Sequence, residues 1–295
     1  MAGKTGGGGV VRVAVVQMAC GGDINHNCDK AEKFVRDAAG AGADIVLLQE
    51  LFSSLYFCPE QNGAHFDKAR ALGESEIVAR FRQVALDTGA VLPVSFFERA
   101  NNAHYNSAAV IDADGTILGV YRKSHIPDGP GYCEKFYFNP GDTGFRVWQT
   151  KAGVIGVGIC WDQWFPEAAR AMALMGADIL LYPTAIGSEP QDASLDSSAH
   201  WLRVMQGHAG ANLCAIAASN RTGMEEVGGV KMKFYGKSFI TGAHGEMLAE
   251  MDDEEGFVMA ELNLPDIRTR RRNWGIFRDR RPSLYKTLLT SDGGG

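Results

Sequence analysis

The sequence lacks the features of a membrane protein, a disordered chain or an exported protein. No run approaches the roughly 18 consecutive apolar residues of a membrane-spanning helix. The first residues are rich in glycine, and Arg12 interrupts the apolar run that follows, so they do not resemble a signal peptide. With 45% hydrophobic and 22% charged residues, the 295-residue chain has the composition of an ordinary folded protein. We therefore expect a cytoplasmic protein.

Cysteine and histidine patterns typical of metal sites are also missing. No two cysteines form C-x-x-C, and no H-x-x-x-H spacing occurs, so we expect no metal site. The even number of cysteines would permit disulfides, but a chain of this length without an export signal is expected to keep its thiols reduced. The six cysteines are Cys20, Cys28, Cys58, Cys133, Cys160 and Cys214.

An excess of basic charge, which nucleic-acid binding favours, is absent. Lysine and arginine number 29 against 35 acidic residues, a net charge of −6. One segment, 268–281, is strongly basic and contains Trp274 and Phe277, as a nucleic-acid patch could. Because acidic residues 252–255 lie close upstream, we favour a C-terminal arm whose arginines pair with acids on a partner subunit.

Apolar runs and turn residues predict alternating strands and helices. Several of the runs are continuously apolar, which is typical of strands buried on both faces. We expect helices at 29–39, 75–87 and 166–175, the second ending at Gly89. The expected strands are 11–17, 44–49, 91–97, 107–111, 117–121, 154–159, 178–182, 213–218, 238–241 and 257–262.

The two halves of the chain repeat one order of elements. Gly42-Ala43-Asp44-Ile45 opens one apolar run, and Gly176-Ala177-Asp178-Ile179 opens another, an offset of 176 − 42 = 134 residues. Hairpin signals at Asp114-Gly115 and His244-Gly245 are offset by 245 − 115 = 130. Short alanine-glycine strings can recur by chance, but the matching order of elements favours a repeat.

This repeat predicts the fold class. Since no Pro- or Ser-rich linker separates the halves, we expect an α/β protein with one domain of two β-α-β-α-β-β units. Its two sheets would face each other with helices outside, as a four-layer α-β-β-α sandwich. The domain would span 10–289, including an arm at 265–289, between flexible ends at 1–9 and 290–295.

The repeat also predicts where chemistry gathers, because ligands of open α/β sheets bind beyond the carboxyl ends of the strands. Glu50 ends the second strand of the first half, and Lys123 follows its hairpin. Cys160 and Thr184 end the first two strands of the second half. We expect these residues to converge on one rim.

Each candidate also has an ordinary structural interpretation. Cys160 could be a nucleophile whose thiolate a helix N-terminus and a cation favour, or a small buried apolar residue. Glu50 could be functional or a strand-end charge that reaches solvent. Lys123 could stabilise an oxyanion or be solvated. Glu134 could be a surface residue beside Lys135.

Two other patterns point to chemistry that we do not favour. His104 and His125 could form a dyad with a cysteine, but histidines in such positions are more often structural. The glycines of 153–158 suggest a dinucleotide fingerprint only superficially, because its last glycine would fall on Trp161 and the glycines lie within the strand.

Residues 45–50, 121–123 and 158–162, in this order, resemble the nitrilase superfamily of carbon–nitrogen hydrolases. The likeness extends from about residue 11 to about 289. It implies the four-layer sandwich and places the family's glutamate, lysine and cysteine on Glu50, Lys123 and Cys160, with a second glutamate at Glu134. Within the family, the chain is most similar to members that act on a cationic ureido compound.

The resemblance also implies a mechanism. Glu50 would take the proton of Cys160, whose thiolate attacks the ureido carbon. Lys123 and the N–H of Trp161 would stabilise the oxyanion, and Glu134 would orient Lys123 or the incoming group. No metal or organic cofactor is required. Other amidases, carbamoylases or nitrilases of the family are the alternatives, and a binding protein without activity is a remote one.

Substrate and partner follow from the same resemblance. The substrate would be a cation with an apolar four-carbon spacer, whose ammonium needs an acid at a distance from the thiol. Glu189 is the candidate, or else an ordinary turn glutamate. Tyr56 and Trp161 could line the aliphatic stem. The resemblance further implies a homo-oligomer that assembles through helix 166–175 and the arm.

Overall fold

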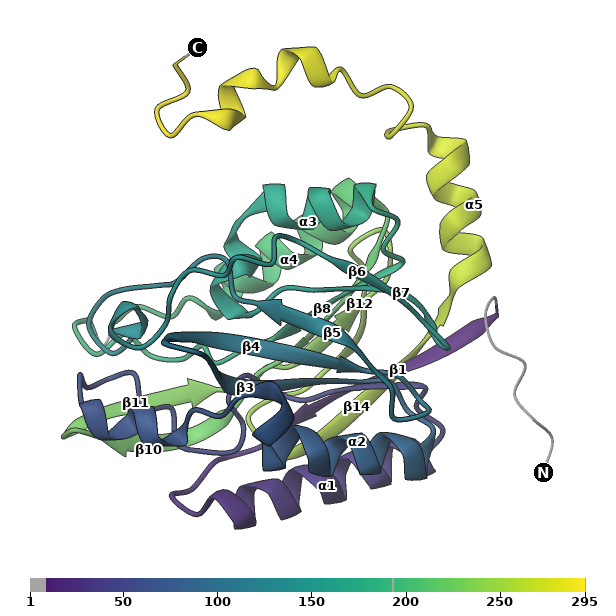
Figure 1. The fold of residues 1–295 in the computed structure, drawn as a ribbon. Coiled ribbons are helices and arrows are strands. Elements are labelled where there is room, and N and C mark those ends of the chain that lie inside the picture. The colour runs from purple at the N-terminus through teal and green to yellow at the C-terminus, as the bar shows by residue number, and fades with distance from the viewer. Residues whose placement is uncertain (1–8, 193, 295) are drawn as a thin grey trace.

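Two β-sheets stack face to face, and helices cover their outer surfaces (Figure 1). The computed structural model describes residues 9–192 and 194–294. Of the ends predicted to be flexible, residues 1–8 and 295 lie outside the described residues. In the first half the elements are β1 (Val10–Gln17), α1 (Ile24–Gly40), β2 (Ile45–Leu47), α2 (Glu76–Thr88), β3 (Leu92–Ala100), β4 (Ala103–Ile111) and β5 (Ile117–Arg122).

The second half repeats this order and adds a small hairpin. Figure 1 shows α1 and α2 over one sheet and α3 and α4 over the other. The elements are β6 (Val147–Thr150), β7 (Gly153–Val157), α3 (Pro166–Leu174), β8 (Ile179–Pro183), α4 (Ser198–Asn212), β9 (Ala215–Ser219), β10 (Thr222–Val227), β11 (Val230–Tyr235), β12 (Phe239–Thr241), β13 (Met247–Glu250), β14 (Gly256–Asn263) and α5 (Leu264–Trp274).

The sheets have equivalent strand orders, which confirms the predicted repeat. The second runs β6-β7-β8-β9-β12-β13. The first runs β14-β1-β2 and continues into β3-β4-β5, because Val46 N donates to Val91 O at 3.0 Å. Each half opens with parallel strands, β1 beside β2 and β7 beside β8. The expected four-layer α/β architecture is therefore present.

The repeated Gly-Ala-Asp strings have the same conformation and the same role. Gly42 and Gly176 have φ of +103° and +100°, a region that favours glycine. The carboxylate of Asp44 accepts from Arg12 N at 2.9 Å, and that of Asp178 accepts from Val154 N at 3.2 Å. In each half an aspartate thus ties the second strand to the first.

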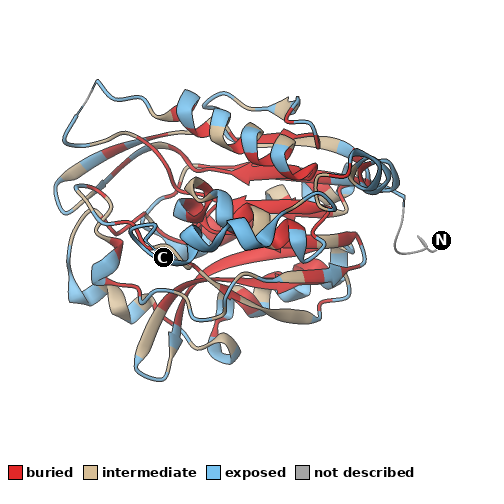
Figure 2. Cartoon of the chain, turned by 90° about the horizontal axis from the view of Figure 1, so that it is seen from above, coloured by how far each residue is buried: buried red, intermediate tan, exposed pale blue. Residues whose placement is uncertain are grey.

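Alternating side chains fill three apolar layers. One face of each sheet packs against the other sheet, and the opposite face packs under its own helices. On β1, for example, Val13 and Val15 lie between the sheets, while Ala14 and Val16 face α1. Figure 2 shows burial concentrated in the strands, with exposed residues on the outer faces of the helices. No helix of the described chain has the length and apolarity to cross a bilayer.

Some elements had been missed in the sequence. α4 contains Gly207 and Gly210, which weaken the helical signal. At Gly210 a Cβ would lie 3.3 Å from His244 O, a tight contact, so a small residue fits there. The β10–β11 hairpin turns at Gly228-Gly229, both with positive φ, as the favoured two-residue turn requires. The Gly-Gly pair is a turn signal that the sequence itself contained and that could have identified this hairpin.

Some arginines of the C-terminal arm pair with acids of the same chain. Arg268 contacts Asp178 at 2.6 Å, and Arg270 contacts Asp266 at 2.7 Å. The pairing of other arginines with acids of a partner subunit stays a prediction. Beyond α5 the arm stands away from the body of the molecule (Figure 1).

Candidate active site

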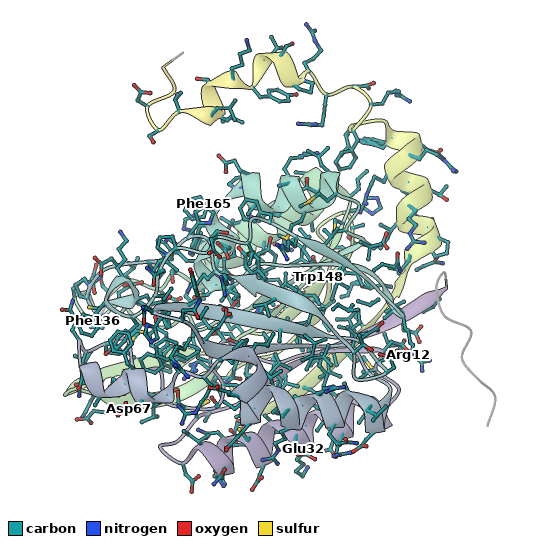
Figure 3. All side chains as sticks on the ribbon, viewed as in Figure 1. Arg12, Glu32, Asp67, Phe136, Trp148 and Phe165 are labelled. Atoms are coloured by element: carbon teal, nitrogen blue, oxygen red, sulfur yellow. The ribbon has the colours of Figure 1, made fainter. Side chains whose placement is uncertain are left out.

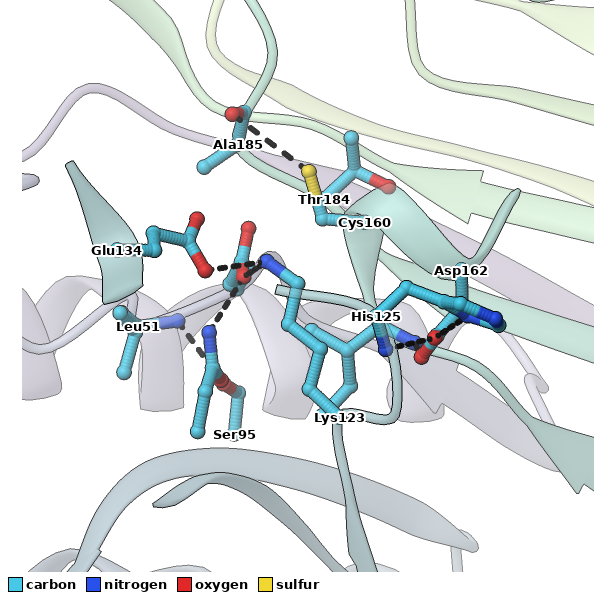
Figure 4. Close-up of polar contacts among 12 residues, drawn as sticks. Leu51, Ser95, Lys123, His125, Glu134, Cys160, Asp162, Thr184 and Ala185 are labelled. Atoms are coloured by element: carbon cyan, nitrogen blue, oxygen red, sulfur yellow. Dashed lines mark hydrogen bonds and ion pairs between the residues drawn. The ribbon is translucent and has the colours of Figure 1, made fainter. Parts of the chain in front are cut away.

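Four sequence candidates meet at one end of the facing sheets. Glu50 lies just beyond β2, and its N–H donates to Thr184 O at the end of β8 (3.3 Å). Lys123 follows β5, and Cys160 follows β7. Figure 4 shows the Lys123 and Glu134 side chains pointing toward each other, with Cys160 nearby and its sulfur directed toward Ala185. The structure thus brings together the rim residues that the repeat indicated.

Lys123 is the centre of the cluster. Its Nζ donates to Glu50 Oε1 at 2.8 Å and to Glu134 Oε2 at 2.6 Å, and all three side chains are buried. Burial by itself would lower the pKa of Lys123, but the carboxylates of Glu134 and Glu50 outweigh it and hold that pKa well above its usual value. The lysine is a permanent cation at this site.

Glu50 is held by one carboxylate oxygen only. Oε1 accepts from Lys123 and from Asn106 Nδ2, the latter at 2.6 Å. Oε2 is buried and has no hydrogen-bond partner among the residues that the structure describes. A carboxylate with one fixed and one unpartnered oxygen can exchange a proton without losing its position.

Cys160 sits in a strained turn. Its φ is +42°, a left-handed conformation that is uncommon for residues other than glycine. Sγ lies 3.7 Å from Ala185 O. Burial, the largest effect, and the charge of Glu50 raise the pKa of the thiol well above its usual range, while Lys123 opposes them. The thiol is therefore protonated at rest and needs a base to react.

Asp162 fixes this turn from behind. Its Oδ2 accepts from Ile159 N at 2.9 Å and from the Tyr121 hydroxyl at 2.7 Å, and its Oδ1 contacts His125 Nδ1 at 2.7 Å. The His125 ring also stacks on Phe165, 3.6 Å between centroids. These contacts support a structural role for His125.

The second histidine is also structural in its contacts. The ring of His104 packs against Phe66 and Phe97, with centroids 4.8 and 5.8 Å away. The backbone N–H of His104 donates to Asn139 Oδ1 at 3.1 Å.

Glu134 lies opposite Glu50 across Lys123. Its Oε1 accepts from the Tyr56 hydroxyl at 2.6 Å. Burial and the nearby charge of Glu50 raise the pKa of Glu134 to about 7, although Lys123 opposes this shift. The alternative of a surface glutamate is wrong, since Glu134 is only 1% exposed. Tyr56, expected to line a substrate stem, uses its hydroxyl to hold Glu134.

The remaining candidates lie toward the outside of the cluster. Trp161 is 41% exposed, and its ring contacts Trp164. Glu189 is half-buried in the loop after β8. Burial first, and then the charges of Glu189 and Cys160, raise the pKa of Tyr132 well above its usual value, so this phenol lies in the electrostatic range of both.

Sequence reasoning missed Asn106, Asp162, Tyr132 and Arg221 as parts of the site. Asn106 is a buried amide next to buried Ser107 on β4, and a polar residue in a buried strand is a signal that could have identified it. The partners of Asp162 and Arg221 are distant in the sequence, so no spacing indicated them. Within residues 9–192 and 194–294 no group of three His, Cys, Asp or Glu side chains could hold a metal ion.

Comparisons with known proteins agree with this geometry. The model of the carbon-nitrogen hydrolase family matches residues 12–272. The chain is 60% identical to the N-carbamoylputrescine amidase of Arabidopsis thaliana, over 96% of each chain. It is 52% identical to the citrullinase of Francisella tularensis, over 95% of this chain and 98% of that one. The crystal structure of a carbon-nitrogen hydrolase from Helicobacter pylori G27 superposes with a TM-score of 0.90 at 40% identity, covering 96% and 99% of the two chains.

We predict that Lys123→Met makes the stability of the protein more sensitive to pH. Without the cation, the pKa of Glu134 in the folded chain rises further above its value in the unfolded chain. A carboxyl with such a raised pKa stabilises the fold at low pH and loses that contribution as the pH rises toward the folded pKa. The deficit in free energy of unfolding against wild type should grow by roughly 1–3 kcal/mol from pH 5 to pH 8.

Urea unfolding at each pH measures this deficit. Lys151→Met is the control, because Lys151 forms an exposed pair with Asp114 at 3.5 Å. A deficit for Lys123→Met that is constant across this pH range would contradict the charge arrangement.

Proposed function

This chain belongs to the carbon–nitrogen hydrolase family, and we propose that it hydrolyses N-carbamoylputrescine to putrescine, carbon dioxide and ammonia, a step of polyamine biosynthesis. It is an amidohydrolase acting on linear carbon–nitrogen bonds. The buried cluster of Glu50, Lys123, Glu134 and Cys160 carries the proposal, because it combines a thiol, a base with one unpartnered oxygen and a fixed cation. The full-length similarity to the Arabidopsis amidase supports the choice of substrate.

The first half of the reaction forms a thioester. Glu50 Oε2 takes the proton of Cys160, and the thiolate attacks the ureido carbon. Lys123 and the N–H of Trp161 stabilise the oxyanion. Glu50 returns the proton to the terminal nitrogen, the carbon–nitrogen bond breaks, and ammonia leaves. Because burial and the charge of Glu50 raise the pKa of the thiol, Cys160 depends on this base to form the thiolate.

The second half releases the product. Glu50 removes a proton from water, and the hydroxide adds to the thioester carbonyl. The carbon–sulfur bond breaks, Cys160 regains its proton, and the N-substituted carbamate leaves. This carbamate decomposes to putrescine and carbon dioxide. Glu134 holds Lys123 in place throughout, and no metal or organic cofactor takes part.

Substrate selection depends on the outer part of the site. Glu189 accepts a hydrogen bond from the distal ammonium, while Tyr56 and Trp161 line the aliphatic stem. Citrulline is the second candidate substrate, because the similarity to the Francisella citrullinase also covers the whole chain. Citrulline carries a carboxylate beside its amine, which Glu189 would repel.

We expect the wild-type protein to release ammonia from N-carbamoylputrescine with a kcat/KM roughly 10- to 100-fold above that for citrulline, 3-ureidopropionate or an uncharged N-alkylurea. This ratio corresponds to one charge-assisted hydrogen bond of about 1.5–3 kcal/mol. An ammonia assay over the four compounds measures it, with Cys160→Ala as the inactive control. A preference for citrulline or 3-ureidopropionate would leave the cysteine chemistry intact and overturn the polyamine substrate.

Glu189→Gln should raise KM for N-carbamoylputrescine roughly 10-fold, because a charge-assisted hydrogen bond becomes a neutral one. The kcat should change little, since Glu189 does not contact the reacting atoms. Glu226→Gln, at an exposed acid of the β10–β11 hairpin, is the matched control. An unchanged KM would remove Glu189 from the amine site.

The protein acts as a homo-oligomer that uses the C-terminal arm and α3. The support is the exposure of large apolar side chains on the arm, which a monomer would leave in water. Trp274 is 75% exposed and Leu289 is 84% exposed. Figure 3 shows the side chains of the arm standing clear of the body.

The domain limits of 10–289 and the cytoplasmic location stay predictions. Six free cysteines in the described structure support the second of these.

Substituting Leu284, Leu288 and Leu289 together by Ser should shift the protein toward a smaller species in sedimentation velocity. These side chains have exposures of 60% or more and would lose an apolar interface. Lys286→Ser on the same segment is the control. An unchanged sedimentation coefficient would exclude the arm as the assembly element.

A further inference from the structure

A fully buried arginine lies directly behind the catalytic glutamate. Arg221, between β9 and β10, has no exposed side-chain surface. Its Nη2 donates to the backbone carbonyls of Glu50 and Leu51 at 2.8 and 3.0 Å. Its Nη1 donates to Ser54 O at 3.3 Å and to Glu225 Oε1 at 2.7 Å. The guanidinium therefore holds three carbonyls of the chain that turns away from β2.

This turn does not hold its shape through local bonding alone. Leu51, immediately after the catalytic glutamate, has a left-handed φ of +48°. Its N–H donates to Ser95 Oγ at 3.0 Å (Figure 4). Because Glu50 shares a peptide bond with this strained residue, any relaxation of Leu51 moves the carboxylate relative to Cys160.

The partner of the arginine reaches the second carboxylate. Glu225 Oε2 accepts from Tyr56 N at 2.7 Å, and the Tyr56 hydroxyl donates to Glu134. Arg221 also lies over the Tyr56 ring, 5.7 Å from its centroid. One ion pair therefore touches the supports of both Glu50 and Glu134.

We propose that Arg221 and Glu225 form a positioning pair that sets the two carboxylates against Lys123 and Cys160. The inference deepens the proposed function and rests on Glu50 being its base. Replacing a buried ion pair by packed apolar residues often leaves the free energy of unfolding unchanged or raises it. Stability of the fold is therefore a weak explanation for Arg221 and Glu225. The planar fork of arginine holds two adjacent carbonyls and a carboxylate in fixed directions from separate nitrogens, whereas the donors of lysine all lie on one nitrogen.

Arg221→Lys keeps the charge and loses the fork, so it tests position instead of charge. We expect kcat for N-carbamoylputrescine to fall roughly 10- to 100-fold with KM changed less than about threefold, as for a displaced catalytic group. Arg268→Lys is the matched control, because its fork binds buried Asp178 at 2.9 and 2.6 Å. The control should lose stability to urea and keep kcat. Equal kcat losses in the two variants would overturn the proposal.

A double-mutant cycle shows whether the effect passes through Glu50. The readout is the rate of Cys160 alkylation by iodoacetamide, which needs no substrate and thus survives a wrong choice of substrate. Arg221→Lys should slow alkylation in the wild-type background and add nothing in the Glu50→Gln background. Independent, multiplicative losses would indicate a merely structural arginine.

Tyr56→Phe tests the second arm and covers the case in which Arg221→Lys does not fold. It removes only the hydroxyl that binds Glu134 and leaves the Tyr56 N–H on Glu225. We expect kcat to fall roughly 10-fold, and the loss on adding Glu225→Gln to be smaller than Glu225→Gln causes in the wild-type background, because part of its effect passes through Tyr56. Losses that multiply in full would separate Glu225 from Glu134 and overturn this arm.

Discussion

The site depends on one constraint, which is that two carboxylates are buried around a single ammonium. Glu50 and Glu134 both contact Lys123, and none of the three side chains reaches water to any extent. Removing one partner of a buried ion pair lowers the free energy of unfolding by about 3–5 kcal/mol, because the remaining charge is left uncompensated. Each of the three charges therefore depends on the others. The same arrangement prepares the chemistry, because the cation is fixed before substrate arrives and the base is held by one oxygen only.

Strain and support around this cluster are organised in pairs. Cys160 and Leu51, at the ends of strands from the two sheets, are both left-handed residues. Each is braced by a buried charged side chain from another part of the chain: Asp162 contacts the Cys160 turn, and Arg221 contacts Leu51. The ends of the two sheets therefore meet at two strained turns, and the surrounding hydrogen bonds maintain their geometry. Strained backbone conformations held in this way are common at reactive sites.

In the proposed function, reaction and substrate choice reside in different parts of the molecule. Relatives with different named substrates, an N-carbamoylputrescine amidase and a citrullinase, are 60% and 52% identical to this chain. Glu189, Tyr132 and Trp161 come from loops after the strands, where side chains can change without disturbing the ion pairs beneath them. The C-terminal arm is tied to the body through Arg268 and Arg271 of α5, and large apolar side chains beyond α5 are exposed.

Much of this protein could be read from the sequence, because its signals are local. Apolar runs, turn glycines and the repeated Gly-Ala-Asp string predicted the strands, the two halves and the rim on which Glu50, Lys123 and Cys160 meet. Hydrophobic periodicity and strand ends depend on neighbouring residues, so they survive in a single sequence. The tertiary structure alone decided which polar side chains stand behind the rim. Arg221 bonds to Glu50 across 171 residues, and Tyr121 bonds to Asp162 across 41. The partners of buried polar groups depend on which side chains are neighbours in space, and the spacing of residues in the sequence does not predict this.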